Sequence, residues 1–204
     1  MDISRFAKLS PVTFGDVLPR TRFMDIGMRP LWEPIPRIAG PAYTVACPPG
    51  DNLMLHAAIH RAPAGSVIVV QGGDRDYALA GGNVCATAQK RGIAGFVLDG
   101  LIRDIAETRD NRFPVFGRGV IPIPGDKKGP GTLDEPVTCG GVRVAPGDIV
   151  VADEEGIVVI EAASADSVLA AAEAKAARDA TETLDGWMRS HKAKIDEAMT
   201  KLGR

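Results

Sequence analysis

The chain has 204 residues, of which 45% are hydrophobic and 25% charged, and its formal net charge is −2. This composition is that of an ordinary globular protein, and so small a net charge excludes a strong attraction to nucleic acid or to an anionic membrane. No apolar run approaches the ~20 residues of a membrane span, and the N-terminal segment has no apolar signal core. The cysteines at 47, 85 and 139 are few and scattered, so we expect a reduced, cytoplasmic protein.

The first quarter of the chain predicts short helices, a strand and a capped helix. Residues 1–36 combine short helical stretches with a proline-rich loop. The segment 38–47 has strand-like composition and is broken by Pro41. Asp51 is placed to cap a helix over residues 51–62, which has an apolar side.

Two apolar runs with a helix between them form the clearest pattern. Val67–Val70 is typical of a strand covered on both faces, and residues 95–100 read as a second buried strand. A helix is expected over 82–91, with Gly92 as its C-terminal cap. A strand, a helix and a strand in so short a stretch predict two parallel neighbours, followed by a short helix at 103–112.

The second half of the chain changes to short β segments and then to helix. Residues 149–152 and 157–160 predict a hairpin. The Ala-rich stretch from 164 predicts a helix to about 189, and a second short helix runs to the end. We therefore expect an α/β core over 1–163 and a C-terminal helical arm over 164–204, packed on the body or on a neighbouring subunit.

The loops that follow the two buried strands are the strongest candidate site. Ligands of open α/β sheets bind outside the carboxyl ends of the strands, and the loops 72–84 and 99–104 open on one edge if the strands are parallel neighbours. The first loop ends in Gly81, Gly82, Asn83 and Val84, which begin a helix. Free N–H groups at a helix start form an anion site, although these glycines also suit a simple turn.

The second loop ends in Arg103 and Asp104. The planar fork of an arginine can clamp a carboxylate, and a single protein carboxylate with waters and substrate commonly holds Mg²⁺. We therefore predict that Arg103 binds an acid substrate and that Asp104 binds a divalent cation. The alternative is a helix-terminal charge in a surface ion pair. His56 and His60 lack the glutamate of a zinc-protease motif, which favours a packing or surface role.

Several segments together resemble one known family. These segments are DNLMLHAAI, GSVIVVQGGDRDYALAGGNV, KRGIAGFVLDGLIRD, FPVFGRG, GPG and PGDIVVADEEGIVVI, in the same order as in the family. The chain resembles the RraA-like family, which includes 4-hydroxy-4-methyl-2-oxoglutarate and 4-carboxy-4-hydroxy-2-oxoadipate aldolases and a regulator of ribonuclease E. The resemblance implies stacked β-sheets flanked by helices, of the swivelling β/β/α kind, and a homotrimer or homohexamer with sites between subunits.

The resemblance also implies roles for particular residues. The family's metal aspartate falls on Asp104, with Mg²⁺ or Mn²⁺ as cofactor, and its pyruvate-binding arginine falls on Arg103. The backbone of residues 81–84 corresponds to the segment that cradles the pyruvyl carboxylate. An acid on a neighbouring subunit's C-terminal helix, which helps to hold the water that moves protons, falls on Asp179.

The activity that the resemblance implies is that of a class II type aldolase. Such a lyase releases pyruvate from a 4-hydroxy-2-oxo acid, and the same enolate chemistry permits oxaloacetate decarboxylation. The alternative is a non-catalytic regulator that binds a ribonuclease. One departure from the family is Gly82, which stands where an Asp or Glu is common. Asp74, Asp76 or Asp99 are candidates to supply the missing carboxylate.

Overall fold

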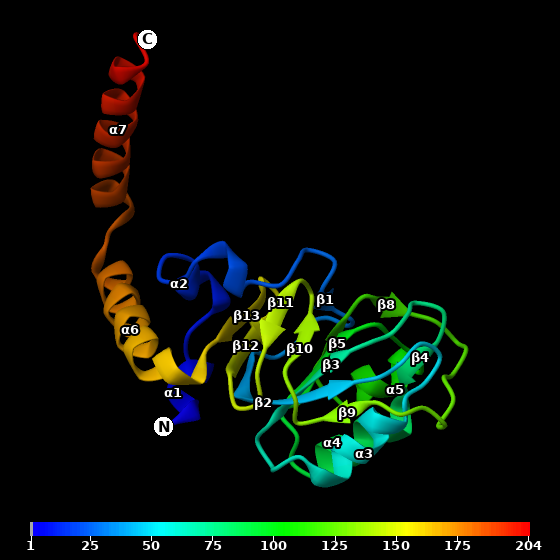
Figure 1. Cartoon of the computed structure of the whole chain (residues 1–204). Helices are drawn as coiled ribbons and strands as arrows, with labels where there is room; N and C mark the ends of the chain where they lie inside the picture. Colours follow the sequence, from blue (N-terminus) through cyan, green and yellow to red (C-terminus); the bar gives the residue numbers. More distant parts are fainter. Residues whose placement is uncertain (1) are drawn as a thin grey trace.

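Residues 2–204 are described by the computed structural model, in which one large mixed sheet is flanked by helices and by smaller groups of strands (Figure 1). The strands are β1 (Arg29–Pro30), β2 (Ile38–Ala46), β3 (Val67–Gln71), β4 (Ala78–Ala80), β5 (Gly95–Asp99), β6 (Leu101–Ile102), β7 (Val115–Gly117), β8 (Gly119–Val120), β9 (Thr132–Leu133), β10 (Val137–Cys139), β11 (Val142–Val144), β12 (Ile149–Asp153) and β13 (Gly156–Ile160). The helices are α1 (Ile3–Ala7), α2 (Pro11–Gly15), α3 (Leu53–Arg61), α4 (Gly82–Lys90), α5 (Ile105–Asp110), α6 (Ala165–Thr181) and α7 (Leu184–Lys201), with short 3-10 turns at 20–22 and 162–164.

The centre of the large sheet is the parallel pair β3–β5, as the sequence predicts. Its register pairs Val67 with Gly95 and Gln71 with Asp99. The strands follow the order β1-β7-β5-β3-β2-β12-β13, and β9 pairs with the end of β2. The apolar residues of β3 are buried on both faces of the sheet, which is why they form a continuous run rather than an alternating one.

Three apolar clusters hold the layers together. One lies between the large sheet and the helices α3 and α4. A second covers the opposite face, where the β10–β11 hairpin and residues 24–35 pack. A third joins β12 and β13 to α1, α2 and α6. These layers confirm the predicted α/β class with stacked sheets flanked by helices (Figure 1).

β2 runs unbroken through Pro41, so the predicted break is wrong. Residues 38–41 pair with β12 in antiparallel register, and residues 42–46 pair with β3 in parallel register. Pro41 therefore lies where β2 changes its partner, and the β3 ladder begins only at Ala42. A proline without an N–H donor is tolerated at such a junction because no bond to β3 depends on it.

The C-terminal helices differ from the prediction in where the first one ends. α6 stops at Thr181 rather than near 189, because Glu182 is extended and the Thr183 hydroxyl accepts a hydrogen bond from Gly186 N at 3.1 Å, which caps a new helix. α6 buries Val168 and Leu169 in the core, whereas α7 has no buried residue in the described chain and extends away from the body (Figure 1). No helix within residues 2–204 is both long and apolar enough to span a bilayer.

Candidate functional site

A small parallel sheet brings the two predicted loops together. β4 follows β3, β6 follows β5, and these short strands pair with Ala78 opposite Leu101 and Ala80 opposite Ile102. The N–H of Arg103 then donates to the carbonyl of Ala80 at 2.9 Å. The sequence analysis predicted loops at these positions. A strand of two or three residues is too short to show an alternating pattern, although the apolar residues of β4 and β6 are consistent with strands.

Gly81 and Gly82 lie directly against the Arg103–Asp104 segment. The N–H of Gly82 donates to Oδ2 of Asp104 at 3.1 Å. A Cβ atom at Gly81 would lie 2.5 Å from Oδ2 of Asp104 and 3.1 Å from Cγ of Arg103. Gly81 has an extended backbone with φ −144° and ψ −174°, which any residue can adopt. The close approach of the two segments, rather than the turn, therefore calls for glycine at 81.

The start of α4 is the segment for which an anion cradle is predicted. Gly82 is buried, Val84 is half-buried and Asn83 is exposed in the first turn of the helix. N–H groups in the first turn have no acceptor within the helix, and the helix dipole makes this end positive. In this structure the carboxylate that occupies the cradle is that of Asp104.

Arg103 and Asp104 stand at an open edge of the molecule. The Nε atom of Arg103 lies 3.6 Å from Oδ2 of Asp104, and the two side chains are 42% and 39% exposed. An exposed pair at this distance contributes little to stability. Asp104 also adopts a left-handed conformation with φ 58° and ψ 44°, which is uncommon for a residue other than glycine and clusters at functional sites.

The donor set around Asp104 fits a divalent cation held largely by water and substrate. Within residues 2–204 no group of three or more His, Cys, Asp or Glu side chains converges as a metal cage. Mg²⁺ needs no such cage, because one or two carboxylates suffice when waters and substrate oxygens complete the coordination. His56 is half-buried, and burial lowers the pKa of its imidazole, which agrees with a packing role.

Two of the aspartates considered as substitutes for an acid at position 82 are engaged elsewhere. Asp99 accepts hydrogen bonds from Nε of Arg118 at 2.8 Å and from Gly140 N at 2.9 Å. Asp74 accepts from the N–H groups of Gly50 and Asp76. Both carboxylates therefore hold neighbouring loops in place.

A different acid, Glu107, approaches the cradle and was not predicted from the sequence. It lies in the first turn of α5. Its carboxylate occupies the space that the Cβ atom of a larger residue at position 82 would take. The available signal was its spacing of three residues from Asp104, which places both side chains on one face of a helix.

The predicted catalytic residue Asp179 lies elsewhere in the single chain. It is exposed on α6 and forms an ion pair with Lys175 at 2.5 Å. α6 packs beside β12 and β13, at the opposite end of the large sheet from α4 and α5 (Figure 1). Any contribution of Asp179 to this site must come from another subunit, which stays a prediction.

The cysteines behave as buried packing residues. All three are free and buried. Burial raises the pKa of the Cys85 thiol to about 11, so this residue of α4 is not a thiolate near neutral pH.

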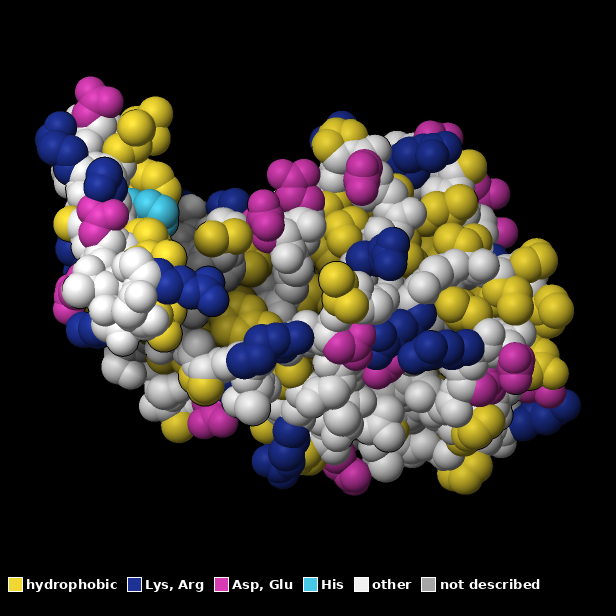
Figure 2. Space-filling model, turned by 90° about the horizontal axis from the view of Figure 1, so that it is seen from above, with side chains coloured by type: hydrophobic (Ala, Val, Ile, Leu, Met, Phe, Trp, Pro, Cys, Tyr) yellow, Lys and Arg dark blue, Asp and Glu magenta, His cyan; other side chains and the backbone are white. Residues whose placement is uncertain are grey.

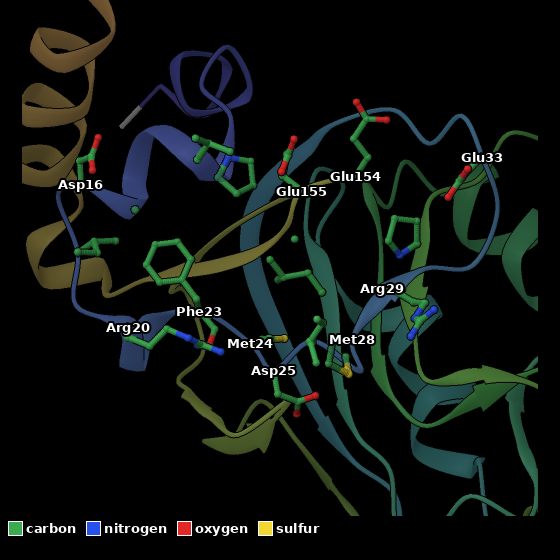
Figure 3. A pocket seen from close by; sticks show the side chains of 18 residues that line it. Asp16, Arg20, Phe23, Met24, Asp25, Met28, Arg29, Glu33, Glu154 and Glu155 are labelled. Atoms are coloured by element: carbon green, nitrogen blue, oxygen red, sulfur yellow. The ribbon is translucent and has the colours of Figure 1, made fainter. Parts of the chain in front are cut away.

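A large cleft lies away from the candidate site. It encloses about 930 Å³ between the N-terminal segment and the β12–β13 turn. Figure 3 shows Phe23, Met24 and Met28 in this cleft with Glu154 and Glu155 from the turn. Figure 2 shows the molecule from above, with a concave surface between the C-terminal arm and the body. The candidate site is instead an open edge on one chain.

Fold and site together define an α/β protein in which a glycine-bordered helix start lies beside an arginine–aspartate pair. The family model described as "RraA-like: Aldolase/RraA" matches residues 8–159. The chain is 38% identical over 178 residues to a Halalkalibacterium halodurans protein named "Putative 4-hydroxy-4-methyl-2-oxoglutarate aldolase", with 87% of this chain and 84% of the relative covered. A Burkholderia multivorans protein of the same name is 43% identical over 124 residues, 60% of this chain and 75% of the relative.

The solved structure of the RNA-processing inhibitor RraA from Thermus thermophilis matches with a TM-score of 0.67 and 29% identity, covering 73% of this chain and 90% of that one. The chain belongs to the RraA-like family. The resemblance predicted from its sequence motifs is thereby confirmed, and the names of its relatives place it in a family of lyases.

Proposed function

We propose that the chain is a divalent-metal-dependent lyase that releases pyruvate from a 4-hydroxy-2-oxo acid. The observation that supports this proposal most directly is the 3.1 Å bond between Gly82 N and Asp104, with Arg103 beside it. The free N–H groups of a helix start, a guanidinium and a carboxylate thus share one edge. These are the groups that a small 2-oxo acid requires.

The cradle would receive the carboxylate of the substrate. Gly82 already donates to a carboxylate oxygen in this structure, which supports the idea that the position accepts such a group. Arg103 is partly exposed, so its planar guanidinium can reach a ligand at the edge. A charged donor placed where negative charge develops lowers the barrier, because its attraction is greatest in the transition state.

Cleavage of the bond between C3 and C4 leaves the electron pair on the pyruvyl unit as an enolate. The 4-hydroxyl loses its proton as C4 becomes a carbonyl, and C3 takes up a proton to give pyruvate. A divalent cation held by Asp104 would supply positive charge that stabilises the enolate. Decarboxylation of oxaloacetate would form the same enolate, because breaking its bond between C3 and C4 releases carbon dioxide.

The complete site is proposed to lie between subunits of a homotrimer or homohexamer. The side chains of Arg103 and Asp104 are 42% and 39% exposed, and Asp179 on α6 is exposed. We propose that Asp179 of a neighbouring subunit helps to hold the proton-carrying water.

The direct test is pyruvate release from a panel of 4-hydroxy-2-oxo acids, with and without Mg²⁺ or Mn²⁺. The wild type should release pyruvate only with the cation, Asp104→Ala should abolish release, and Arg103→Ala should lose most of it. Equal turnover by wild type and Asp104→Ala would show that the assignment of the metal ligand is wrong.

A second candidate function is protein binding of the kind that the RraA name describes. It is favoured by the likeness to the Thermus thermophilis RNA-processing inhibitor. Such a protein would bind a ribonuclease through its outer surface without a cation. Tight, metal-independent binding of a purified ribonuclease, together with no pyruvate release from any substrate, would support this function over the lyase.

A further inference from the structure

Arg118 lies where two neighbouring strands pass from the large sheet to the small one. β5 pairs with β7 in the large sheet, and β6 pairs with β8 in the small sheet. Gly100 is the single residue between β5 and β6, and Arg118 is the single residue between β7 and β8. The N–H of Arg118 donates to the carbonyl of Gly100 at 2.9 Å, so the two crossings are hydrogen-bonded to each other.

The side chain of Arg118 joins this crossing to the N-terminal segment. Its Nε atom donates to Oδ1 of Asp99 at 2.8 Å, and its Nη2 atom donates to Oδ2 of Asp25 at 2.7 Å. Asp25 belongs to the segment that borders the large cleft (Figure 3). The planar fork of an arginine holds two carboxylates in a fixed geometry, which the single ammonium group of a lysine does not reproduce.

Gly140, in the turn between β10 and β11, closes these contacts into a ring. Its N–H donates to Oδ2 of Asp99 at 2.9 Å, and its carbonyl accepts from the N–H of Asp25 at 2.9 Å. The Arg118 side chain is only 11% exposed, so water and salt screen its ion pairs less than they screen pairs at the surface. Both oxygens of Asp99 are therefore bound by groups from outside its own strand.

The ring reaches the candidate site through β6. This strand has only two residues, and Arg103 and Asp104 follow it directly. Beyond β6, the N–H of Arg103 is bonded to the carbonyl of Ala80. Groups that bind a ligand must be held to within about 0.5 Å by the contacts that support them. The direction in which so short a strand places Arg103 and Asp104 depends on how its first end is held.

We propose that Arg118 is a positioning residue for Arg103 and Asp104, an inference that rests on the proposed function. It fixes Asp99 and Gly100 at the start of β6. Through β6 it sets the place at which the Arg103 guanidinium meets the substrate and the Asp104 carboxylate meets the cation. Arg118 keeps its proton and its charge throughout, and it takes part in no bond that forms or breaks.

Two substitutions test the contact from its two sides. Arg118→Lys keeps the charge but loses the fork, and Asp99→Asn keeps one oxygen in place of two, so the bond to Arg118 or to Gly140 is lost. Each should weaken Mn²⁺ binding and lower kcat/KM about tenfold, the lower end of the usual loss when a group that orients a metal ligand is replaced.

Arg22→Lys is the matched control. The Arg22 side chain is 14% exposed, and its Nε atom donates to the carbonyl of Val159 at 2.8 Å. It therefore also ties the N-terminal segment to a strand, but to β13, at the opposite end of the large sheet from α4 and α5. This variant should lose stability while it keeps the Mn²⁺ affinity and the kcat/KM of the wild type.

The experiment has two arms, one of which does not depend on activity. The first measures Mn²⁺ binding from the electron paramagnetic resonance signal of the free ion, and pyruvate release at saturating Mn²⁺ from the 4-hydroxy-2-oxo acid that the wild type cleaves fastest. The second measures backbone hydrogen exchange by mass spectrometry in segments 100–104 and 67–71. Thermal unfolding verifies that each variant is folded.

Faster exchange at 100–104 with unchanged exchange at 67–71, together with the expected losses of affinity and kcat/KM, supports the proposal. Wild-type affinity and kcat/KM in Arg118→Lys overturn it. Equally faster exchange in both segments shows that Arg118 serves only the stability of the fold, and it overturns the proposal too. A wild type that neither binds Mn²⁺ nor releases pyruvate sinks the lyase function, whereas the exchange at 100–104 still decides whether Arg118 places this segment.

Discussion

The backbone N–H of Gly82 donates a 3.1 Å hydrogen bond to Oδ2 of Asp104, which lies 22 positions further along the chain. This bond caps α4 with a carboxylate from the start of α5 and joins the two turns of the candidate site. Asp104 does so from a left-handed conformation, which Asp and Asn adopt more readily than other side chains. Its structural role and its proposed role as a metal ligand can therefore be separated by substitution.

Asp104→Asn should retain the fold and lose the activity. The amide oxygen can still accept from Gly82, but a neutral amide is a weaker ligand for a hard cation than a carboxylate. Asp104→Ala should lose the activity and, in addition, about 1 kcal/mol of unfolding free energy, as is usual for a lost N-terminal cap. Urea unfolding and the pyruvate assay measure the two effects. Wild-type turnover in Asp104→Asn would contradict the metal role.

Gly81→Ala should impair the site more than the fold. The new Cβ would meet Oδ2 of Asp104 at 2.5 Å, so the carboxylate must shift, whereas the extended backbone at 81 accepts alanine. We expect pyruvate release to fall at least about tenfold, which corresponds to roughly 1.4 kcal/mol of lost transition-state stabilisation. Gly15→Ala, where a Cβ meets nothing within 4 Å, is the control and should remain fully active. Equal activity of the two variants would argue against a close-packed cradle.

The free energy of unfolding should decrease as the pH is lowered, because the Asp25–Arg118 ion pair is lost. The Arg118 guanidinium holds the pKa of the Asp25 carboxyl below its ordinary value, so this pair stabilises the folded state above about pH 4 and loses its effect as the pH falls through the folded-state pKa. Because the Asp25 side chain is 45% exposed, solvent screening keeps the contribution below about 1 kcal/mol. Urea unfolding of wild type and Asp25→Asn should differ at pH 7 and converge toward pH 3. A difference that does not change with pH would exclude this cause.

α7 should be covered in the assembled protein. It exposes Met188, Ile195 and Met199 at helical spacing, and no α7 residue in the described part of the chain is buried. Light scattering should find a trimer or hexamer for the wild type and smaller species for Ile195→Asp. Lys194→Ala changes the net charge by the same amount on the neighbouring residue and should assemble normally. A monomeric wild type would disprove the proposed assembly.

Local sequence patterns were sufficient to predict the strands and helix at the centre of the fold. Val67–Val70 is apolar at every position because it is covered on both faces, and that run can be read without knowing what covers it. Gly92 ends the helix after Lys90 with φ 79°, a conformation that glycine adopts easily. The hairpin of β12 and β13 follows from two apolar runs around a polar turn.

The same local patterns wrongly predicted that Pro41 breaks the strand. Whether a proline is tolerated there depends on which strand pairs with each side of β2. By itself, the sequence determined the buried parallel strands, the glycine-bordered loops and the presence of Arg103 and Asp104 at the end of one of them. The tertiary structure alone decided that the small sheet of β4 and β6 joins those loops, and that Glu107 fills the space beside Gly82. The reason is physical. Apolar runs and turns are set by neighbours along the chain, whereas the distance between the starts of α4 and α5 is set by how these two helices pack.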